Sequence, residues 1–150
     1  MEQFVTKNSQ KSIKIIPSNF RKAHILKCET LKCLKNTGIF DKIKDLKNIQ
    51  LDALFNELAN LLITVDTSEG FNKAVMDCLS VCICDDTHAL TEQYFNDCPE
   101  LWEDYYEIVA KCVEVNLRPF FKSLTSELST RLEITGSSQA SELPQTEQII

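Results

Sequence analysis

The fold class is decided by residues 99–121, which read PELWEDYYEIVAKCVEVNLRPFF. Pro99 suits the first position of a helix, where no backbone N–H is needed. The acidic residues that follow it lie at the positive end of the helix dipole. Apolar side chains then recur every three or four residues as far as Val115, which predicts an amphipathic helix. We expect Pro119 to kink or end this helix, because its ring displaces a backbone hydrogen bond.

Two features near Pro119 bear on packing. Asn116 lies near the apolar face of the predicted helix, just where Pro119 frees backbone carbonyls. Buried amides need hydrogen-bond partners, so we expect Asn116 to satisfy those carbonyls or a neighbouring loop. Of the two phenylalanines beyond the kink, Phe120 and Phe121, we expect one in the core and leave the other open as a hydrophobic partner site.

Further helices are predicted upstream of this stretch. Residues 18–36 carry a modest apolar stripe and end before Gly38, which supplies a C-terminal stop. Residues 51–65 repeat leucines at helical steps, whereas residues 39–50 fit either a helix or a connector. Residues 84–90 are a polar connector with at most a little extended structure. Good N-caps precede the helices and a short turn: Ser18, Thr67 or Ser68, and Thr91.

The two ends of the chain lack a helical pattern. Residues 1–17 show no helical period and no cap, so we expect a flexible arm with at most one short strand. Residues 133–150 are rich in Ser, Thr, Gln and Glu, which predicts a disordered tail. Few glycines and prolines argue against a turn-rich sandwich or barrel. The predicted fold is therefore all-α, a single-domain bundle of four to five helices over residues 18–132.

The seven cysteines invite a metal-site hypothesis. Cys78, Cys82 and Cys84 are closely spaced, and His88 and Cys98 follow them. Structural zinc usually takes two tight ligand pairs, yet the sequence contains neither C-x2-C nor H-x3-H. Cys78 and Cys82 also share the apolar stripe of their predicted helix, where free cysteine packs as a small hydrophobe. We therefore predict core packing, with no metal and no cofactor.

The sequence contains neither a catalytic motif nor a membrane-targeting pattern. The only two histidines, His24 and His88, lie in surroundings typical of a solvated surface, and no nucleophile or phosphate-loop motif occurs. The sequence therefore predicts that the protein is not an enzyme. Its apolar runs are far shorter than the roughly 20 residues of a membrane span. An odd number of cysteines without a signal-peptide pattern indicates a cytoplasmic protein with reduced thiols.

Charge divides the chain unevenly. Residues 1–50 hold 11 Lys/Arg and 4 Asp/Glu, whereas residues 51–150 hold 5 and 18. Cations can bind nucleic acid, but here they are scattered, without a recognisable module, and the acidic remainder would repel a duplex. Nucleic acid is therefore not expected as a partner. Docking between the two charged halves, within the chain or in a homo-oligomer, is more plausible. The predicted charged interface comprises Glu103, Glu107, Glu114, Arg21, Lys32 and Lys35.

The C-terminal part of the chain resembles a known family. The run WEDYYEIV at residues 102–109 is followed by Val113, Asn116, residues 119–121 and Leu124. This pattern is similar to the C-terminal helix of small tail assembly chaperones of long-tailed bacteriophages. The likeness in size, acidic charge, helical make-up and polar tail covers roughly residues 20–132.

The resemblance implies a non-enzymatic chaperone that binds the tape measure protein, keeps it soluble and helps to recruit tail tube subunits. It carries over no catalytic residues. Such a client presents amphipathic helices, which lay an apolar face into a groove. Two alternatives stay open: a helical regulatory or nucleic-acid-binding protein acting through basic residues 7–47, and a structural tail component. The client contacts we expect are Trp102, Tyr105, Phe120 and Phe121.

Overall fold

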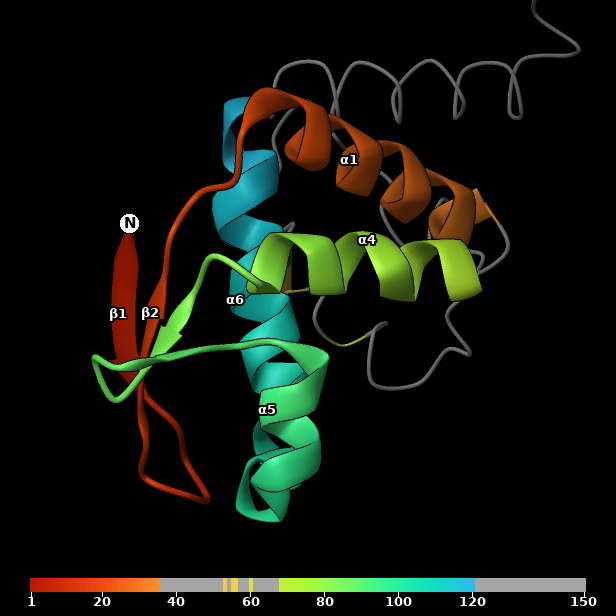
Figure 1. The fold of residues 1–150 in the computed structure, drawn as a ribbon. Coiled ribbons are helices and arrows are strands. Elements are labelled where there is room, and N and C mark those ends of the chain that lie inside the picture. The colour runs from red at the N-terminus through yellow and green to blue at the C-terminus, as the bar shows by residue number, and fades with distance from the viewer. Residues whose placement is uncertain (36–52, 54, 57–59, 61–67, 121–150) are drawn as a thin grey trace, which may run out of the picture.

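The computed structural model describes residues 1–35 and 68–120, together with positions 53, 55, 56 and 60 (Figure 1). Those four positions are helical, and Phe55 is buried in the core. The rest of the predicted helix over 51–65, the segment 39–50 and the predicted tail over 133–150 lie outside the described residues.

The all-α prediction is wrong, because the chain contains a four-stranded antiparallel sheet with strand order β1-β2-β3-β4. The fold is therefore mixed α/β, and the predicted flexible arm is a β-hairpin. Alternation explains the hairpin: Ile13 and Ile15 face the core while Lys14 faces outward, which is the period of a strand. The strands are β1 (Glu2–Val5), β2 (Ser12–Ile15), β3 (Ile83–Cys84) and β4 (His88–Ala89).

The connector predicted over residues 84–90 contains the turn between β3 and β4 and supplies the last strand of the sheet. β2 pairs with β3 through Ile13 opposite Cys84, and β3 turns back into β4 with Cys84 opposite His88. Asp85 and Asp86 both have positive φ, 52° and 65°. Aspartate tolerates this left-handed region because its short side chain bonds locally, so the hairpin turns without glycine.

The helices largely follow the predicted caps. Ser68 accepts a hydrogen bond from the backbone N–H of Phe71 (3.1 Å), and Thr91 accepts one from Tyr94 (3.1 Å), which confirms both N-caps. The first helix is capped by Asn19 instead of Ser18. The α-helices are α1 (Phe20–Lys35), α4 (Glu69–Leu79), α5 (Glu92–Asp97) and α6 (Tyr105–Leu117).

Residues 99–120 fold into three consecutive helical elements. A 3-10 helix, η1 (Pro99–Asp104), starts at the proline, α6 follows it directly, and a second 3-10 helix, η2 (Arg118–Phe120), comes after α6. The α-helix ends two residues before Pro119, so the predicted break is confirmed. Its physical cause is the missing backbone N–H and the bulk of the proline ring.

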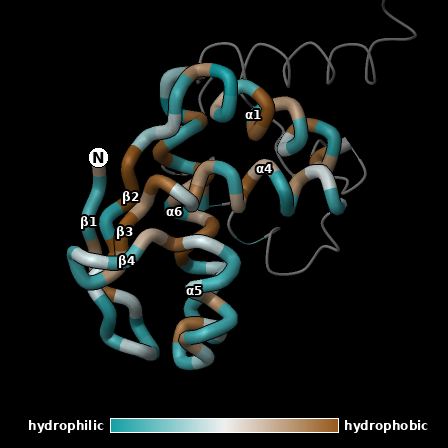
Figure 2. Tube along the Cα trace, in the orientation of Figure 1, coloured by the Kyte–Doolittle hydropathy of each residue, from teal (hydrophilic) through white to brown (hydrophobic). Residues whose placement is uncertain are grey.

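The core surrounds α6. Figure 1 shows α6 between the sheet and the pair formed by α1 and α4, and residues of α6 contact α1, α4 and β2. In Figure 2 hydrophobic positions alternate with polar ones along α1 and α4, as expected for helices buried on one face. None of the helices in the described residues is long and apolar enough to cross a membrane. The largest fully buried side chains are Phe71, Ile13, Ile15, Leu26, Leu79, Leu90, Leu101, Ile108 and Leu117.

Candidate functional site

A groove of about 1040 Å³ lies between α4, α5 and the junction of η1 with α6. One wall is aromatic and is formed by Phe95, Trp102, Tyr105 and Tyr106, while α4 contributes Met76 to the apolar lining. Exposed aromatic side chains that gather in one groove, such as Trp102 and Tyr106 here, mark a candidate binding site. We therefore take this groove as the candidate site.

Trp102 is the most exposed aromatic residue of the groove. Its indole N–H donates to the backbone carbonyl of Phe95 (2.7 Å), yet 58% of the residue is exposed. The hydrogen bond satisfies the polar edge of the indole and fixes the ring, so an apolar face is held toward solvent. A ring that is both fixed and exposed is suited to contact with another molecule.

Three further rings support this wall. Phe95 and Tyr105 meet edge to face with centroids 5.7 Å apart, and Tyr105 meets Tyr106 in the same way at 5.4 Å. Burial raises the pKa of Tyr105, so its phenol stays neutral at physiological pH. Tyr106 remains 48% exposed. Edge-to-face contacts of this kind order the rings before any partner arrives.

Carboxylates border the groove. Glu69 and Glu92 stand in the first turns of α4 and α5, where the helix dipole favours negative charge. Asp77 also lines the groove and pairs with Lys73, Nζ to Oδ2, at 3.2 Å. The rim therefore combines three acids with one base, and its net charge is negative.

The structure brings together only part of the predicted client-contact set. Trp102 and Tyr105 line the groove, whereas Phe120 lies beyond the opposite end of α6. There the centroid of its ring lies 6.1 Å from the ring centroids of both Phe20 and His24. Phe121 lies outside the described residues. Sequence reasoning missed the contributions of Phe95, Tyr106 and Met76, which lie on three different elements.

The acidic part of the predicted charged interface, here called the acidic stripe, comprises Glu103, Glu107 and Glu114 on η1 and α6. Most of it bonds within the chain. The side chain of Glu107 accepts the backbone N–H of Lys7 (3.1 Å), and Glu114 pairs with Lys111 (3.8 Å) and Arg118. Glu103 is exposed. Of the stripe, only Glu103 keeps its carboxylate free of such contacts among the described residues.

The basic members of the predicted interface lie on α1. Arg21 is exposed, and Lys32 pairs with Glu29 of the same helix at 3.1 Å. The side chain of Lys35 is not among the described ones. These residues are therefore placed on one helix, without a contact to the acidic stripe in the described part of the chain.

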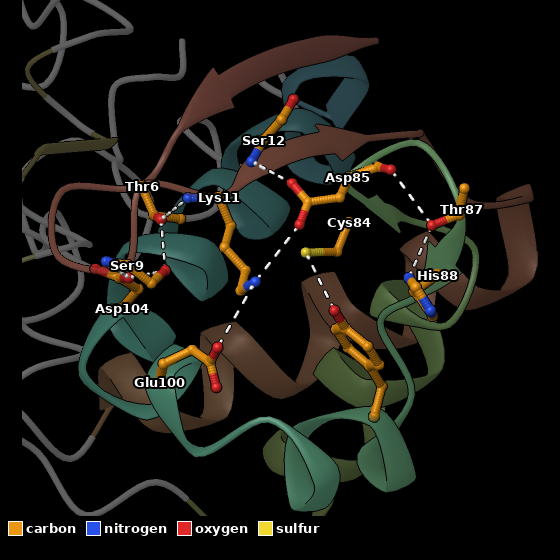
Figure 3. Close-up of polar contacts among 11 residues, drawn as sticks. Thr6, Ser9, Lys11, Ser12, Cys84, Asp85, Thr87, His88, Glu100 and Asp104 are labelled. Carbon is orange, nitrogen blue, oxygen red and sulfur yellow. Dashed lines mark hydrogen bonds and ion pairs between the residues drawn. The ribbon is translucent and has the colours of Figure 1, made fainter.

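Sequence reasoning missed a buried carboxylate, Asp104. It is 1% exposed and accepts four hydrogen bonds from the β1–β2 loop, two from Asn8 and two from Ser9. Figure 3 shows Ser9 beside Asp104. Burial by itself raises its pKa, but the bonds from Ser9 and Asn8 outweigh burial and lower the pKa to about 2. Asp104 therefore stays charged and ties the hairpin to the start of α6.

Lysines of the hairpin meet acids from the middle of the chain. Lys11 lies 3.5 Å from Asp85 and 3.7 Å from Glu100 (Figure 3). Lys14 lies 3.9 Å from Asp86. Part of the charge asymmetry of the sequence is thus paired inside the molecule. Each exposed pair adds little stability, but together they orient the hairpin.

The cysteines are all free. Cys78 and Cys82 gather with Cys112, and a hydrogen bond from the Cys112 thiol lowers the pKa of Cys78 and of Cys82 against the effect of burial. Cys84 instead accepts the hydroxyl of Tyr94 (3.7 Å). Across the residues that the structure describes, no group of three or more His, Cys, Asp or Glu side chains is placed to hold a metal ion.

Asn116 has the structural role predicted for it. Its amide nitrogen donates to the carbonyl of Cys112 (2.9 Å), and its amide oxygen accepts the backbone N–H of Ser18 (2.8 Å). The residue is 1% exposed. One side chain thus satisfies a carbonyl of α6 and the loop that leads into α1.

An exposed aromatic groove on a small α/β scaffold is a feature of domains that bind other proteins. A family model described as phage tail assembly chaperone protein, TAC, matches residues 7–129. Because the match covers more than half of the chain, this protein belongs to the phage tail assembly chaperone family. The resemblance seen in residues 102–124 is confirmed. Comparisons with curated proteins and with solved structures yield no match.

Proposed function

We propose that this chaperone binds an amphipathic helix of the tape measure protein in the groove between α4, α5 and the η1–α6 junction. It acts in the host cytoplasm, keeps that client soluble, helps to recruit tail tube subunits and leaves before the virion is complete. The observation that carries the proposal is the fixed and exposed indole of Trp102 in an aromatic groove.

The lining of the groove supports a helix as the occupant. Amphipathic helices dock by placing apolar side chains, spaced three or four residues apart, into a groove between helices. At about 1040 Å³ the groove is at the upper end of small-molecule sites, which span roughly 300–1000 Å³. Its lining places four rings and Met76 together, with charged groups at the rim, which suits a row of apolar side chains on one face of a helix.

The family assignment supports a non-enzymatic role. The nucleic-acid-binding alternative is less well supported, because Lys11 and Lys14 already pair with acidic side chains of the same chain. A structural tail component differs from a chaperone in one respect, since it would be found in purified particles. Analysis of the protein content of purified particles therefore distinguishes the two roles, and it also tests whether this protein leaves before assembly ends.

Co-expression with the tape measure protein tests the proposal. We expect the soluble fraction of the client to rise with the wild-type chain and to fall again with Trp102→Ala or Tyr106→Ala. Phe20→Ala is the matched control, because Phe20 is a 73% exposed aromatic residue that does not line the groove. Thermal unfolding of each variant checks that it folds.

Two results would contradict the proposal. The client could be no more soluble with the wild-type chain than without it, in which case the tape measure protein is not the client. Alternatively, Phe20→Ala could abolish the effect while Trp102→Ala keeps it. That outcome would move the site to the cluster of Phe20, His24 and Phe120.

A further inference from the structure

The acidic residues of this chain differ in whether they have partners. Most carboxylates in the described residues pair with a cation or accept a hydrogen bond. Glu69, Glu92 and Glu103 form no such contact within that part of the chain. Two of these three, Glu69 and Glu92, line the aromatic groove. The paired or hydrogen-bonded acids are Glu2, Glu29, Asp77, Asp85, Asp86, Asp97, Glu100, Asp104, Glu107 and Glu114.

The position of these two carboxylates matters. Glu69 begins α4 and Glu92 begins α5, so they come from two different elements bordering the groove. Both residues are exposed. A helix lying in the groove would therefore find, beside the apolar wall, two carboxylates that form no contact within the described part of the chain.

The aromatic wall favours the same sign of charge. The N–H of Trp102 is already bonded to Phe95, and 58% of the residue is exposed, so the surface that the indole offers to a partner is its carbon ring system. The face of an indole attracts ammonium and guanidinium groups more than other aromatic rings do. Tyr106, 48% exposed, adds a second ring at the same site.

We infer that the groove selects client helices in which lysine or arginine side chains flank the apolar stripe. The apolar residues of such a helix contact the rings, and its cations meet Glu69, Glu92 and the face of Trp102. This inference rests on the proposed function and adds a chemical criterion for the client segment. Because the charged contacts are near solvent, binding should weaken as salt rises.

Two synthetic helices test the inference. They carry the same apolar stripe, flanked by lysine in one peptide and by glutamate in the other, and their binding to the full chain is measured by calorimetry at low and high salt. We expect the lysine peptide to bind about tenfold more tightly at low salt, and the preference to shrink at high salt.

Variants locate the effect. The neutral double variant Glu69→Gln/Glu92→Gln should reduce the preference, and Glu69→Lys/Glu92→Lys should reverse it. Glu103→Lys is the matched control for a single added cation, because Glu103 is also exposed, also lacks a carboxylate contact within the described residues, and does not line the groove. Thermal unfolding confirms that each variant is folded, since a lysine at a helix start opposes the dipole.

Equal binding of the two peptides would overturn the charge criterion and leave the groove as a binding site. Loss of the preference in Glu103→Lys would overturn it as well, and would place the contact on the acidic stripe of η1 and α6. If neither peptide binds, the groove fails as a client site and the inference fails with it.

Discussion

Ser9 donates both its hydroxyl and its backbone N–H to one carboxylate oxygen of Asp104, at 2.6 and 2.8 Å. Asn8 bonds to the other oxygen in the same way, through its backbone N–H (3.0 Å) and its side-chain amide (2.9 Å). Asp104 directly precedes Tyr105 and follows Trp102 by two positions. The clamp therefore fixes the junction that carries the aromatic wall of the groove.

Asp104→Asn tests how much this clamp stabilises the fold. The variant keeps the size of the side chain but removes its charge and turns an amide NH2 toward groups that are themselves donors. We expect the free energy of unfolding to fall by about 2–3 kcal/mol, because hydrogen bonds to a buried charge are strong. Urea unfolding at pH 7, followed by circular dichroism, measures the change.

Asp86→Asn is the control for that experiment. Asp86 is exposed and meets Lys14 at 3.9 Å, so its loss should cost less than about 1 kcal/mol. Similar losses in the two variants would contradict a special role for Asp104 and would point to a general effect of lowering the negative charge.

The stability of the protein should depend on the charge of Asp104 at low pH. The pKa of Asp104 is lowered to about 2 in the folded chain, below its ordinary value of 3.8. The folded state thus binds the proton less readily than the unfolded state. Stability from this group is complete above pH 4 and is lost as the pH falls from 4 to 2.

The measurement is the difference in unfolding free energy between wild type and Asp104→Asn, taken at several pH values. We expect this difference to be constant near neutral pH and to shrink between pH 4 and 2. A difference that stays constant over that interval would mean that the carboxylate is not held charged by Ser9 and Asn8.

Asn116→Ala should destabilise the protein by about 1–3 kcal/mol, because the N–H of Ser18 then loses its acceptor in a part-buried position. Asn96→Ala is the matched control, since Asn96 is exposed, and it should change stability by less than about 0.5 kcal/mol. Equal stability of Asn116→Ala and wild type in urea unfolding would show that water replaces the amide.

Local signals made the helices predictable. Ser68 and Thr91 are N-caps that act within three residues of their own position, and the apolar period of α4 and α6 is repeated within each helix. The tryptophan and the first tyrosine of the groove were found because they belong to one such amphipathic segment. Each of these features depends only on neighbouring residues.

The sheet and the clamp depend on residues far apart in the sequence. Ile13 and Ile15 alternate with Lys14 over only four positions, which is too short a pattern to separate a strand from an arm. Their partner strand β3 is two residues long and begins at Ile83. The acid at 104 looked like one more carboxylate near a helix start, because its partners come 95 and 96 residues earlier.

The proposed docking of a client helix beside Trp102 can be followed directly, because that residue is the only tryptophan of the chain. Its fluorescence is therefore a direct probe when a tryptophan-free amphipathic peptide from the tape measure protein is titrated into the full chain. We predict a saturable shift of the emission to shorter wavelength, because the peptide covers the exposed indole face. Binding seen by calorimetry with an unchanged emission spectrum would contradict docking of the helix beside Trp102.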